Sequence, residues 1–273
     1  MTSFIGQGAG NPMISIRGVS VSFGRRRVLD HIDLDVRRGE ILVLLGGSGS
    51  GKTTILRHVL GLAKPEGGSI TINGVDITCS SESDLARVRR RIGVAFQGGA
   101  LFNSLSLEDN VALPLQELTR LADSTIKLMV WMYLHAVGLP DSAKLYPPEL
   151  SGGMRKRAAI ARAMALSPEI LVLDEPSAGL DPIVSAGLDE LILHLKRGFG
   201  VTFLVVTHEL ESAFRIADRL AMLHEGHLMV VDTKEKVAGS TDPWVRQFLD
   251  RQPEGAPRRT EEFIESYLRE FQK

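Results

Sequence analysis

The 273-residue chain is poor in cysteine, in aromatic residues and in charge of one sign. Cys79 is the only cysteine, which excludes an internal disulfide and is typical of proteins from a reducing compartment. Aromatic residues make up 5% of the chain and the formal net charge is −1, so the composition does not indicate a protein that binds nucleic acid. Three short arginine runs, 25–27, 37–38 and 89–91, are predicted to be solvated turns and a helix end.

Long hydrophobic runs are also missing. No apolar run approaches the roughly 20 residues that a helix needs to cross a bilayer. Residues 1–12 lack the apolar segment of a signal peptide and are expected to be disordered. If the protein works at a membrane, we therefore expect another chain to hold it there. The length allows a sizeable core, in one large α/β domain with appendages or in two small domains.

One glycine-rich stretch lies between an apolar run, 41–45, and a helix-forming segment, 54–62. It consists of Gly46, Gly47, Ser48, Gly49, Ser50, Gly51, Lys52 and Thr53. Strand, glycine-rich turn, lysine, hydroxyl and helix form the context of a phosphate-binding P-loop, in which backbone N–H groups surround an anion. We expect Lys52 to reach the β- and γ-phosphates, Thr53 to hold Mg²⁺ and Thr54 to line the same site. A turn that only links strand to helix is disfavoured by the four glycines and the flanks.

Hydrophobic patterns predict strands that alternate with helices. Imperfect alternation indicates strands over 14–23 and 28–36 and a hairpin over 69–77, whereas continuous apolar runs at 41–45, 92–96, 170–173 and 202–206 are typical of buried parallel strands. Helices are predicted over 81–90, 183–196 and 209–216. The stretch 107–166 contains no strand candidate, and we expect a projecting helical subdomain broken at Pro114, 138–140 and 147–148. The pattern predicts a parallel α/β sheet with one nucleotide site.

Two acidic residues, Asp174 and Glu175, follow the predicted strand 170–173. In P-loop enzymes an aspartate at such a strand end lies near the metal, so Asp174 is the candidate metal ligand. Glu175 is placed to polarise a water for attack on the γ-phosphate. Two acids after a strand are more often a turn or a helix cap, but a preceding P-loop favours the catalytic interpretation.

A second anion-binding pattern lies at Ser151, Gly152 and Gly153, where a capping serine and two glycines precede a helix. Alone, this stretch fits an ordinary capped helix equally well. Leu150-Ser151-Gly152-Gly153 between a P-loop and an acid-ended strand resembles the signature of the ABC ATPases. The resemblance covers roughly residues 14–231 and implies a P-loop NTPase fold with a RecA-like parallel-sheet core, an N-terminal antiparallel β subdomain and an inserted α-helical subdomain. We expect an ATPase domain over 13–240, with the helical subdomain over about 98–166, and a C-terminal helical extension over 241–273.

The resemblance assigns four further residues. Gln97 matches the Q-loop, which senses Mg²⁺ and water, Asp181 matches the D-loop, and His208 matches the switch histidine at the γ-phosphate. Phe23 occupies the place of the aromatic residue that stacks on adenine, although a single phenylalanine in an apolar strand fits the core about as well. In this family two ATPase subunits form a head-to-tail dimer, and ATP with Mg²⁺ lies between the P-loop of one subunit and the signature of the other. Met154 replaces the glutamine usual after the signature glycines, and we expect ATPase activity to survive this change.

Four segments resemble the ATPases of Mla/Mce-type phospholipid transporters of Gram-negative bacteria. They are 96–105, 109–115, 150–154 and 242–249. The resemblance implies work on the cytoplasmic side of the inner membrane, which powers phospholipid transfer between the inner and outer membranes. It also implies a homodimer of ATPase subunits, an integral membrane permease dimer, a membrane-anchored Mce-domain protein and a small STAS-domain protein as partners. An ABC ATPase for another cargo, or a non-transport ABC protein, is the alternative.

Two apolar segments suggest contacts with other chains. Residues 100–102, beside the Q-loop, are expected to receive a cytoplasmic coupling helix of the permease, with a buried core segment as the alternative. Near the end, Asp242 and Pro243 predict a helix start, with apolar side chains on one face. An amphipathic helix is predicted over 260–271. Docking of this helix on the second ATPase subunit, or on its own core, fits the pattern equally well.

Overall fold

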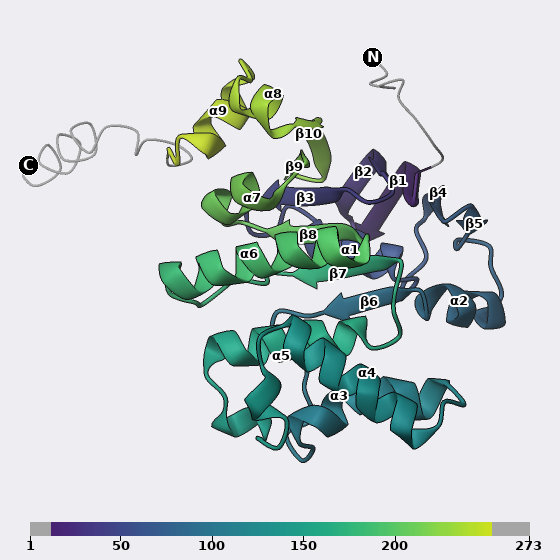
Figure 1. Ribbon diagram of the computed structural model, residues 1–273. Helices are drawn as coiled ribbons and strands as arrows, with labels where there is room; N and C mark the ends of the chain where they lie inside the picture. Colours follow the sequence, from purple (N-terminus) through teal and green to yellow (C-terminus); the bar gives the residue numbers. More distant parts are fainter. Residues whose placement is uncertain (1–11, 253–273) are drawn as a thin grey trace, which may run out of the picture.

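The computed structural model describes residues 12–252, which form two sheets, the larger of which lies among the helices (Figure 1). The larger sheet has the strand order β10-β9-β3-β8-β7-β6, and the smaller one has the order β2-β1-β4-β5. The strands are β1 (Ile14–Phe23), β2 (Arg26–Val36), β3 (Ile41–Gly46), β4 (Gly67–Ile72), β5 (Val75–Asp76), β6 (Ile92–Ala95), β7 (Ile170–Asp174), β8 (Thr202–Thr207), β9 (Arg219–His224) and β10 (His227–Thr233). The α-helices are α1 (Lys52–Val59), α2 (Glu82–Arg89), α3 (Leu107–Leu118), α4 (Asp123–Ala136), α5 (Gly152–Met164), α6 (Pro182–Phe199), α7 (Leu210–Ile216), α8 (Lys234–Ala238) and α9 (Pro243–Leu249).

The central sheet brings the expected site together at one edge. Strands β9, β3, β8, β7 and β6 run parallel, and only β10 is antiparallel to its neighbour. Leu45 is level with Thr207, and Asp174 is level with Val206. The carboxyl ends of β3, β7 and β8 therefore meet at one edge of the sheet, where ligands of open α/β sheets bind.

Both faces of this sheet are covered, which explains the continuous apolar runs of its strands. Every residue of β3 and β8 is buried. Ile41, Val43 and Leu45 face one core with α3 to α7, whereas Leu42 and Leu44 face a second core. The second core is shared with α1, α2 and the antiparallel sheet. The predicted α/β fold with an antiparallel β subdomain is confirmed.

The helical region packs against the β6 edge of the central sheet through α5, with α3 and α4 outside it (Figure 1). Two short 3₁₀ turns, Pro140–Ser142 and Pro147–Glu149, lie between α4 and α5. The predicted break at Pro114 is wrong, because α3 continues through this residue. Its neighbours Val111 and Leu115 are buried in the core, and this packing holds the helix together despite the missing backbone donor.

Other boundaries differ from the sequence pattern for local reasons. Helix α1 begins at Lys52 rather than at residue 54, because Gly51 adopts φ 111° and turns the loop directly into the helix. It ends at Val59, before Gly61 at φ 63°. Strands β9 and β10 were not predicted. They form a hairpin around Glu225 and Gly226, which both have positive φ, as a two-residue hairpin turn requires.

The end of the described chain is a short helix, as predicted. Asp242 caps α9, and its Oδ1 accepts hydrogen bonds from the Trp244 and Val245 N–H groups. The ring of Trp244 stacks on that of His224, with centroids 4.3 Å apart, which fastens α9 to β9. Residues 1–11 and the predicted amphipathic helix over 260–271 lie outside the described residues. Within residues 12–252, no helix combines the length and the apolar character needed to span a bilayer.

Candidate active site

The P-loop connects β3 to α1 and contains two glycines that tolerate no side chain. A Cβ at Gly46 would lie 2.3 Å from the Leu223 carbonyl oxygen, and one at Gly51 would lie 2.7 Å from the Leu29 side chain. Gly49 and Gly51 also have positive φ, a region that favours glycine. Packing and backbone conformation together therefore fix glycine at these positions. The loop delivers its backbone N–H groups to the start of α1, whose first turn contains no acidic residue.

Lys52 is buried at this helix start. Its Nζ donates hydrogen bonds to the carbonyl oxygens of Gly46, at 2.7 Å, and Gly47, at 2.9 Å. Burial lowers the pKa of Lys52, while the charges of Glu175 and Asp174 act in the opposite direction. The ammonium thus binds the P-loop carbonyls within the field of the two acids, and its predicted contact with the β- and γ-phosphates stays a prediction.

Asp174 and Glu175 lie at the carboxyl end of β7, and each is partly buried. Burial raises the pKa of Asp174, as does the neighbouring charge of Glu175, and Lys156 and Lys52 oppose this shift. Glu175 Oε1 lies 2.9 Å from His208 Nδ1, and Oε2 accepts a hydrogen bond from Thr207 Oγ1 at 3.1 Å. The Glu175 side chain is 12% exposed. The end of β8 therefore orients both carboxylate oxygens of Glu175.

The chemistry of the P-loop and its surroundings fits a nucleoside triphosphate. The Ser50 hydroxyl, inside the P-loop, is buried and has no hydrogen-bond partner within the described residues. Residues 12–252 hold no cluster of three or more His, Cys, Asp or Glu side chains that could bind a metal ion by itself. The expected ligands Thr53, Gln97 and Asp174 supply two uncharged oxygens and one carboxylate. A hard cation held by these residues would complete its coordination with phosphate oxygens, as Mg²⁺ commonly does.

Gln97 follows β6, and its side chain is exposed. Its carbonyl oxygen accepts a hydrogen bond from Lys156 Nζ at 2.6 Å, and the same ammonium donates to the Glu175 carbonyl oxygen at 2.8 Å. Sequence reasoning missed Lys156, because both partners are backbone atoms that lie 59 and 19 residues away in the chain. The only signal was its position in a basic run directly after the signature.

The signature residues begin α5. Ser151 is the N-cap, and its Oγ accepts a hydrogen bond from the Met154 N–H at 3.2 Å. A Cβ on Gly153 would lie 2.5 Å from Val184 Cγ1, at the start of α6, so this glycine is needed for packing as well. Met154 packs partly against the main core.

Asp181 is the N-cap of α6, and its Oδ1 accepts hydrogen bonds from the N–H groups of Ile183 and Val184. Its carboxylate therefore shapes the loop that packs against the signature glycines. A contact of Asp181 with nucleotide stays a prediction.

Phe23 and Phe102 are exposed, although the alternative interpretation of each sequence segment placed it in the core. Phe23 is 60% exposed at the end of β1, and Phe102 is 52% exposed. Ala100 is exposed too, whereas Leu101 packs partly against the core. The buried alternative is wrong for Phe23, Ala100 and Phe102, and the roles of these residues as contacts stay predictions.

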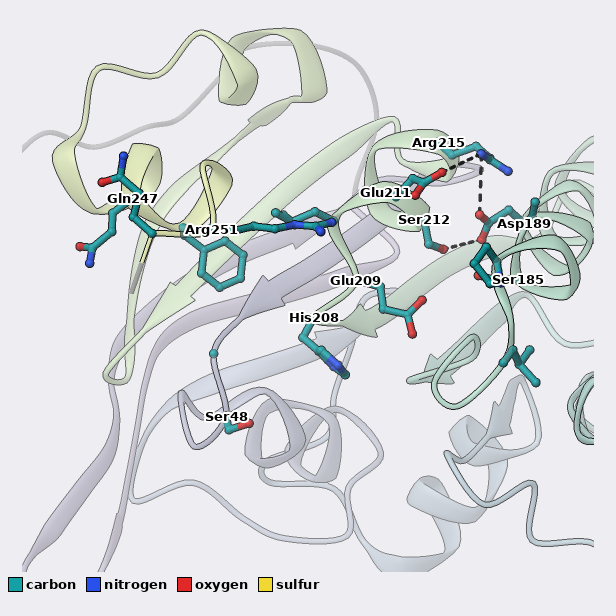
Figure 2. A pocket seen from close by; sticks show the side chains of 17 residues that line it. Ser48, Ser185, Asp189, His208, Glu209, Glu211, Ser212, Arg215, Gln247 and Arg251 are labelled. Carbon is teal, nitrogen blue, oxygen red and sulfur yellow. Dashed lines mark hydrogen bonds and ion pairs between the residues drawn. The ribbon is translucent and has the colours of Figure 1, made fainter. Parts of the chain in front are cut away.

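A cleft of about 640 Å³ extends from the P-loop to α9 (Figure 2). Its lining includes Gly47 of the P-loop. Ser48 lies at one end, His208 in the middle and Arg251 at the other end. Residues from α6 and α7 form the remaining wall, including Asp189, Ser212 and Arg215. Residues 151–153 are not part of this lining. The two predicted anion cradles thus do not share this cleft within one chain.

This fold and site define a P-loop ATPase of the ATP-binding-cassette type. A family model described as ABC transporter matches residues 29–178. The chain belongs to the ABC transporter family, as an ATP-hydrolysing subunit.

Several curated relatives cover most of this chain. The intermembrane phospholipid transport system ATP-binding protein MlaF of Escherichia coli K12 is 43% identical over 238 residues, 87% of this chain and 88% of MlaF. MlaF of Haemophilus influenzae is 40% identical over 95% of this chain and 98% of its own length. The probable ribonucleotide transport ATP-binding protein mkl of Mycobacterium leprae is 43% identical over 94% of this chain and 74% of mkl.

Solved structures agree with the fold. A dimeric structure of the ATP-binding cassette MJ0796 in a post-hydrolysis state, bound to ADP and Pi, has a TM-score of 0.74 at 30% identity. The match covers 81% of this chain and 98% of the MJ0796 cassette. CbiO1 of Clostridium perfringens, part of the ABC transporter complex cbiONQ, has a TM-score of 0.80 at 26% identity, with 89% of this chain and 97% of CbiO1 covered.

Proposed function

We propose that this protein powers phospholipid transfer between the inner and outer membranes by hydrolysing ATP at the site described above. The observation that supports ATP hydrolysis most directly is the Glu175 carboxylate, held by His208 and Thr207 at the mouth of the P-loop. Support for the cargo comes from 40–43% identity to MlaF over most of the chain.

In this proposal each group has one role. The P-loop N–H groups and Lys52 bind the phosphates, Phe23 stacks on adenine, and Thr53, Gln97 and Asp174 hold Mg²⁺. Bound Mg²⁺ would neutralise charge that develops on the phosphates during transfer. Glu175 accepts the proton of the attacking water, and His208 keeps its carboxylate aimed at that water.

The proposed catalytic unit is a head-to-tail homodimer. The P-loop cleft excludes Ser151, Gly152 and Gly153, so these amides are available to complete the site of a second subunit. The MJ0796 cassette, which resembles this chain, was solved as a dimer. Asp181 would hold the loop that meets the partner subunit. Residues 13–240 would form the ATPase domain, with its helical subdomain over about 98–166, and residues 241–273 would extend it.

The proposed partners follow from exposed apolar surface. Phe96 and Phe102 are 43% and 52% exposed beside the Q-loop, a surface suited to a coupling helix of a permease dimer. On the helical subdomain, Leu128 and Trp131 are 64% and 58% exposed, which suits a small STAS-domain protein. A membrane-anchored Mce-domain protein would complete the assembly. The subunit would thus lie on the cytoplasmic side of the inner membrane, attached through the permease.

A second cargo is supported by a specific comparison. The mkl protein, named a probable ribonucleotide transport ATP-binding protein, is as similar to this chain as MlaF is. For either cargo, ATP would be hydrolysed at the site described above and the partner chains would select the cargo. Only identification of the partners and their ligand can separate the two cargoes.

The test is a tagged pull-down from detergent-solubilised membranes with wild type and Glu175→Gln in the presence of ATP. We expect a multi-span permease, an Mce-domain protein and co-purified phospholipid, with more complex retained by Glu175→Gln because hydrolysis no longer releases the dimer. ATPase activity of this variant should fall by about 100-fold or more, the range for loss of a general base. Glu235→Gln, the same chemical change at an exposed position of α8, is the matched control.

Recovery of a permease with ribonucleotide instead of phospholipid would favour the cargo of the mkl name. Recovery of ribosomes or DNA without a membrane protein would contradict the transport proposal and leave only the ATPase chemistry. Lipid should be identified by mass spectrometry after extraction, because detergent alone carries background lipid into any membrane preparation.

A further inference from the structure

The side chain of Lys156 joins three motifs that lie far apart in the sequence. It leaves α5 directly after the signature, and its Nζ reaches the Gln97 carbonyl oxygen at 2.6 Å and the Glu175 carbonyl oxygen at 2.8 Å. One ammonium thus connects the helix of the signature, the Q-loop and the catalytic carboxylate residue. Charge-assisted hydrogen bonds of this kind are roughly twice as strong as neutral ones.

Burial and nearby charges act on the Lys156 ammonium in opposite directions. Burial lowers the pKa of Lys156, and the charges of Glu175, Asp174 and Glu209 oppose that shift. A lysine that only covered apolar surface would extend its ammonium to water. Here the ammonium instead donates to two backbone carbonyls.

Glu175 depends on such support because its backbone is strained. Its φ is 48°, a conformation that is unfavourable for a non-glycine residue and persists only where its surroundings impose it. The Glu175 N–H donates to the Val206 carbonyl at 2.8 Å. Its own carbonyl accepts from Lys156 Nζ at 2.8 Å and, in a longer bond, from the Ala178 N–H at 3.4 Å. These bonds hold the peptide groups on either side of the Cα. They set the direction in which the carboxylate leaves the backbone, toward His208.

A second cation on α5 holds the far end of the Q-loop. Arg162 Nη1 donates to the Ala100 carbonyl at 2.6 Å, and Nη2 donates to the Gly99 carbonyl at 3.1 Å. Together, Lys156 and Arg162 bind the carbonyls of Gln97, Gly99 and Ala100 from one helix. The loop that leads to the exposed Phe102 is therefore attached to α5, and Lys156 alone extends this attachment to Glu175.

We infer that Lys156 is a positioning residue that couples the two ATP sites of the dimer. The inference rests on the proposed head-to-tail arrangement, in which the N-terminus of α5 contacts the nucleotide of the partner subunit. A displacement of α5 that follows binding in the partner site pulls the Glu175 carbonyl and the Q-loop of its own site through the Lys156 ammonium. Each site then becomes catalytically aligned only when the other site is filled.

The test compares Lys156→Met, which keeps an unbranched side chain of nearly the same length but removes the ammonium, with Lys156→Arg, which keeps the charge. Lys156→Met should lower kcat by about 10- to 100-fold, the range for a small misplacement of a catalytic group. The KM for ATP should change less than threefold, which corresponds to less than about 0.7 kcal/mol. The ATP dependence of the rate should be cooperative in wild type and have a Hill coefficient near 1 in Lys156→Met. Lys156→Arg should recover at least a third of the wild-type kcat.

A second readout needs no nucleotide. Hydrogen exchange at the amides of 97–102 and 175–178 should be faster in Lys156→Met than in wild type, and the exposed control Lys127→Met should match wild type. Thermal unfolding shows whether each variant folds. If Lys156→Met fails to fold, Lys156→Gln replaces it in both measurements.

The outcomes separate the inference from the proposed function. If wild type shows no ATP-dependent association, the dimer proposal and this inference both fall. If wild type associates and Lys156→Met matches Lys127→Met in kcat, Hill coefficient and exchange, only the coupling role is overturned. Slower turnover with unchanged cooperativity and unchanged exchange would also overturn it.

Discussion

The carboxamide of Asn110 binds both peptide groups of Phe102. Asn110 Oδ1 accepts the Phe102 N–H at 2.8 Å, and Nδ2 donates to the Phe102 carbonyl at 3.1 Å. The same Nδ2 lies within hydrogen-bonding distance of the carbonyls of Leu105 and Ser106. Asn110 has no exposed surface, whereas Phe102 is 52% exposed. One buried side chain therefore shapes the loop that presents the proposed permease contact.

Replacement of Asn110 by leucine should lower the free energy of unfolding by about 2–4 kcal/mol, because buried carbonyls and one N–H lose their partner. It should also weaken co-purification of the permease, since the loop at Phe102 loses its shape. Urea unfolding and the pull-down measure the two effects. Asn103→Ala, at an exposed position of the same loop, should change neither. Wild-type stability in Asn110→Leu would contradict the role of the carboxamide.

Much of the site could be predicted because its chemistry is contiguous in the sequence. The P-loop and the Asp174–Glu175 pair each occupy one short stretch, and parallel strand topology brings such stretches to one sheet edge. The pattern of buried runs also predicted β3, β6, β7 and β8 in nearly their observed bounds. Local sequence was sufficient wherever a motif and its supporting strand are neighbours in the chain.

The remainder depends on contacts between distant segments. Lys156 binds backbone carbonyls, which carry no sequence signal, and Gly153 is fixed by Val184 from another helix. Strand β9 has a buried run of four residues, as β7 does, and this signal was missed; β9 pairs with β3 in parallel. Pro114 favoured a break, and packing of the surrounding helix overrode it. For Lys156, Gly153 and Pro114, tertiary contact decided what local propensity left open.

The packing of Gly153 on Val184 predicts a compensating pair. Gly153→Ala should destabilise the protein by about 1–3 kcal/mol, because the added methyl would lie 2.5 Å from Val184 Cγ1. Val184→Ala in the same chain should recover most of this loss, since it removes the opposing methyl groups. A double-mutant cycle of unfolding free energies measures the coupling. Additive effects would show that Gly153 is required for another reason, such as access of phosphate to its amide.

The exposure of Phe23 predicts an effect on binding without an effect on folding. Phe23→Ala should raise the dissociation constant for a non-hydrolysable ATP analogue about 5- to 10-fold, because an aromatic contact of roughly 1 kcal/mol is lost. Phe23→Trp should bind the analogue at least as well as wild type does. Unfolding free energy should stay within about 0.5 kcal/mol in both variants. Calorimetric titration measures the affinity. Equal affinity of Phe23→Ala and wild type would exclude the stacking role.

The buried carboxyl of Asp189 predicts a pH dependence of stability. Asp189 is 2% exposed in the wall of the cleft, accepts a hydrogen bond from Ser212 and lies 3.9 Å from Arg215. Burial is the largest influence and raises the pKa of Asp189, although the Ser212 hydrogen bond and Arg215 oppose it. The folded protein therefore holds this proton more tightly than the unfolded chain does.

The sign of the effect follows from linkage. Stability that arises from protonated Asp189 is fully present below the ordinary aspartate pKa of about 3.9 and is lost as pH rises through the raised pKa of the folded state. Asp189→Asn cannot titrate, so the unfolding free energy of wild type should increase relative to this variant as pH falls from neutral toward the ordinary aspartate pKa of about 3.9. Urea unfolding at several pH values measures the difference. Asp141→Asn, an exposed change, should keep the pH profile of wild type. A difference that shrinks or stays constant on acidification would show that Ser212 and Arg215 outweigh burial at this carboxyl.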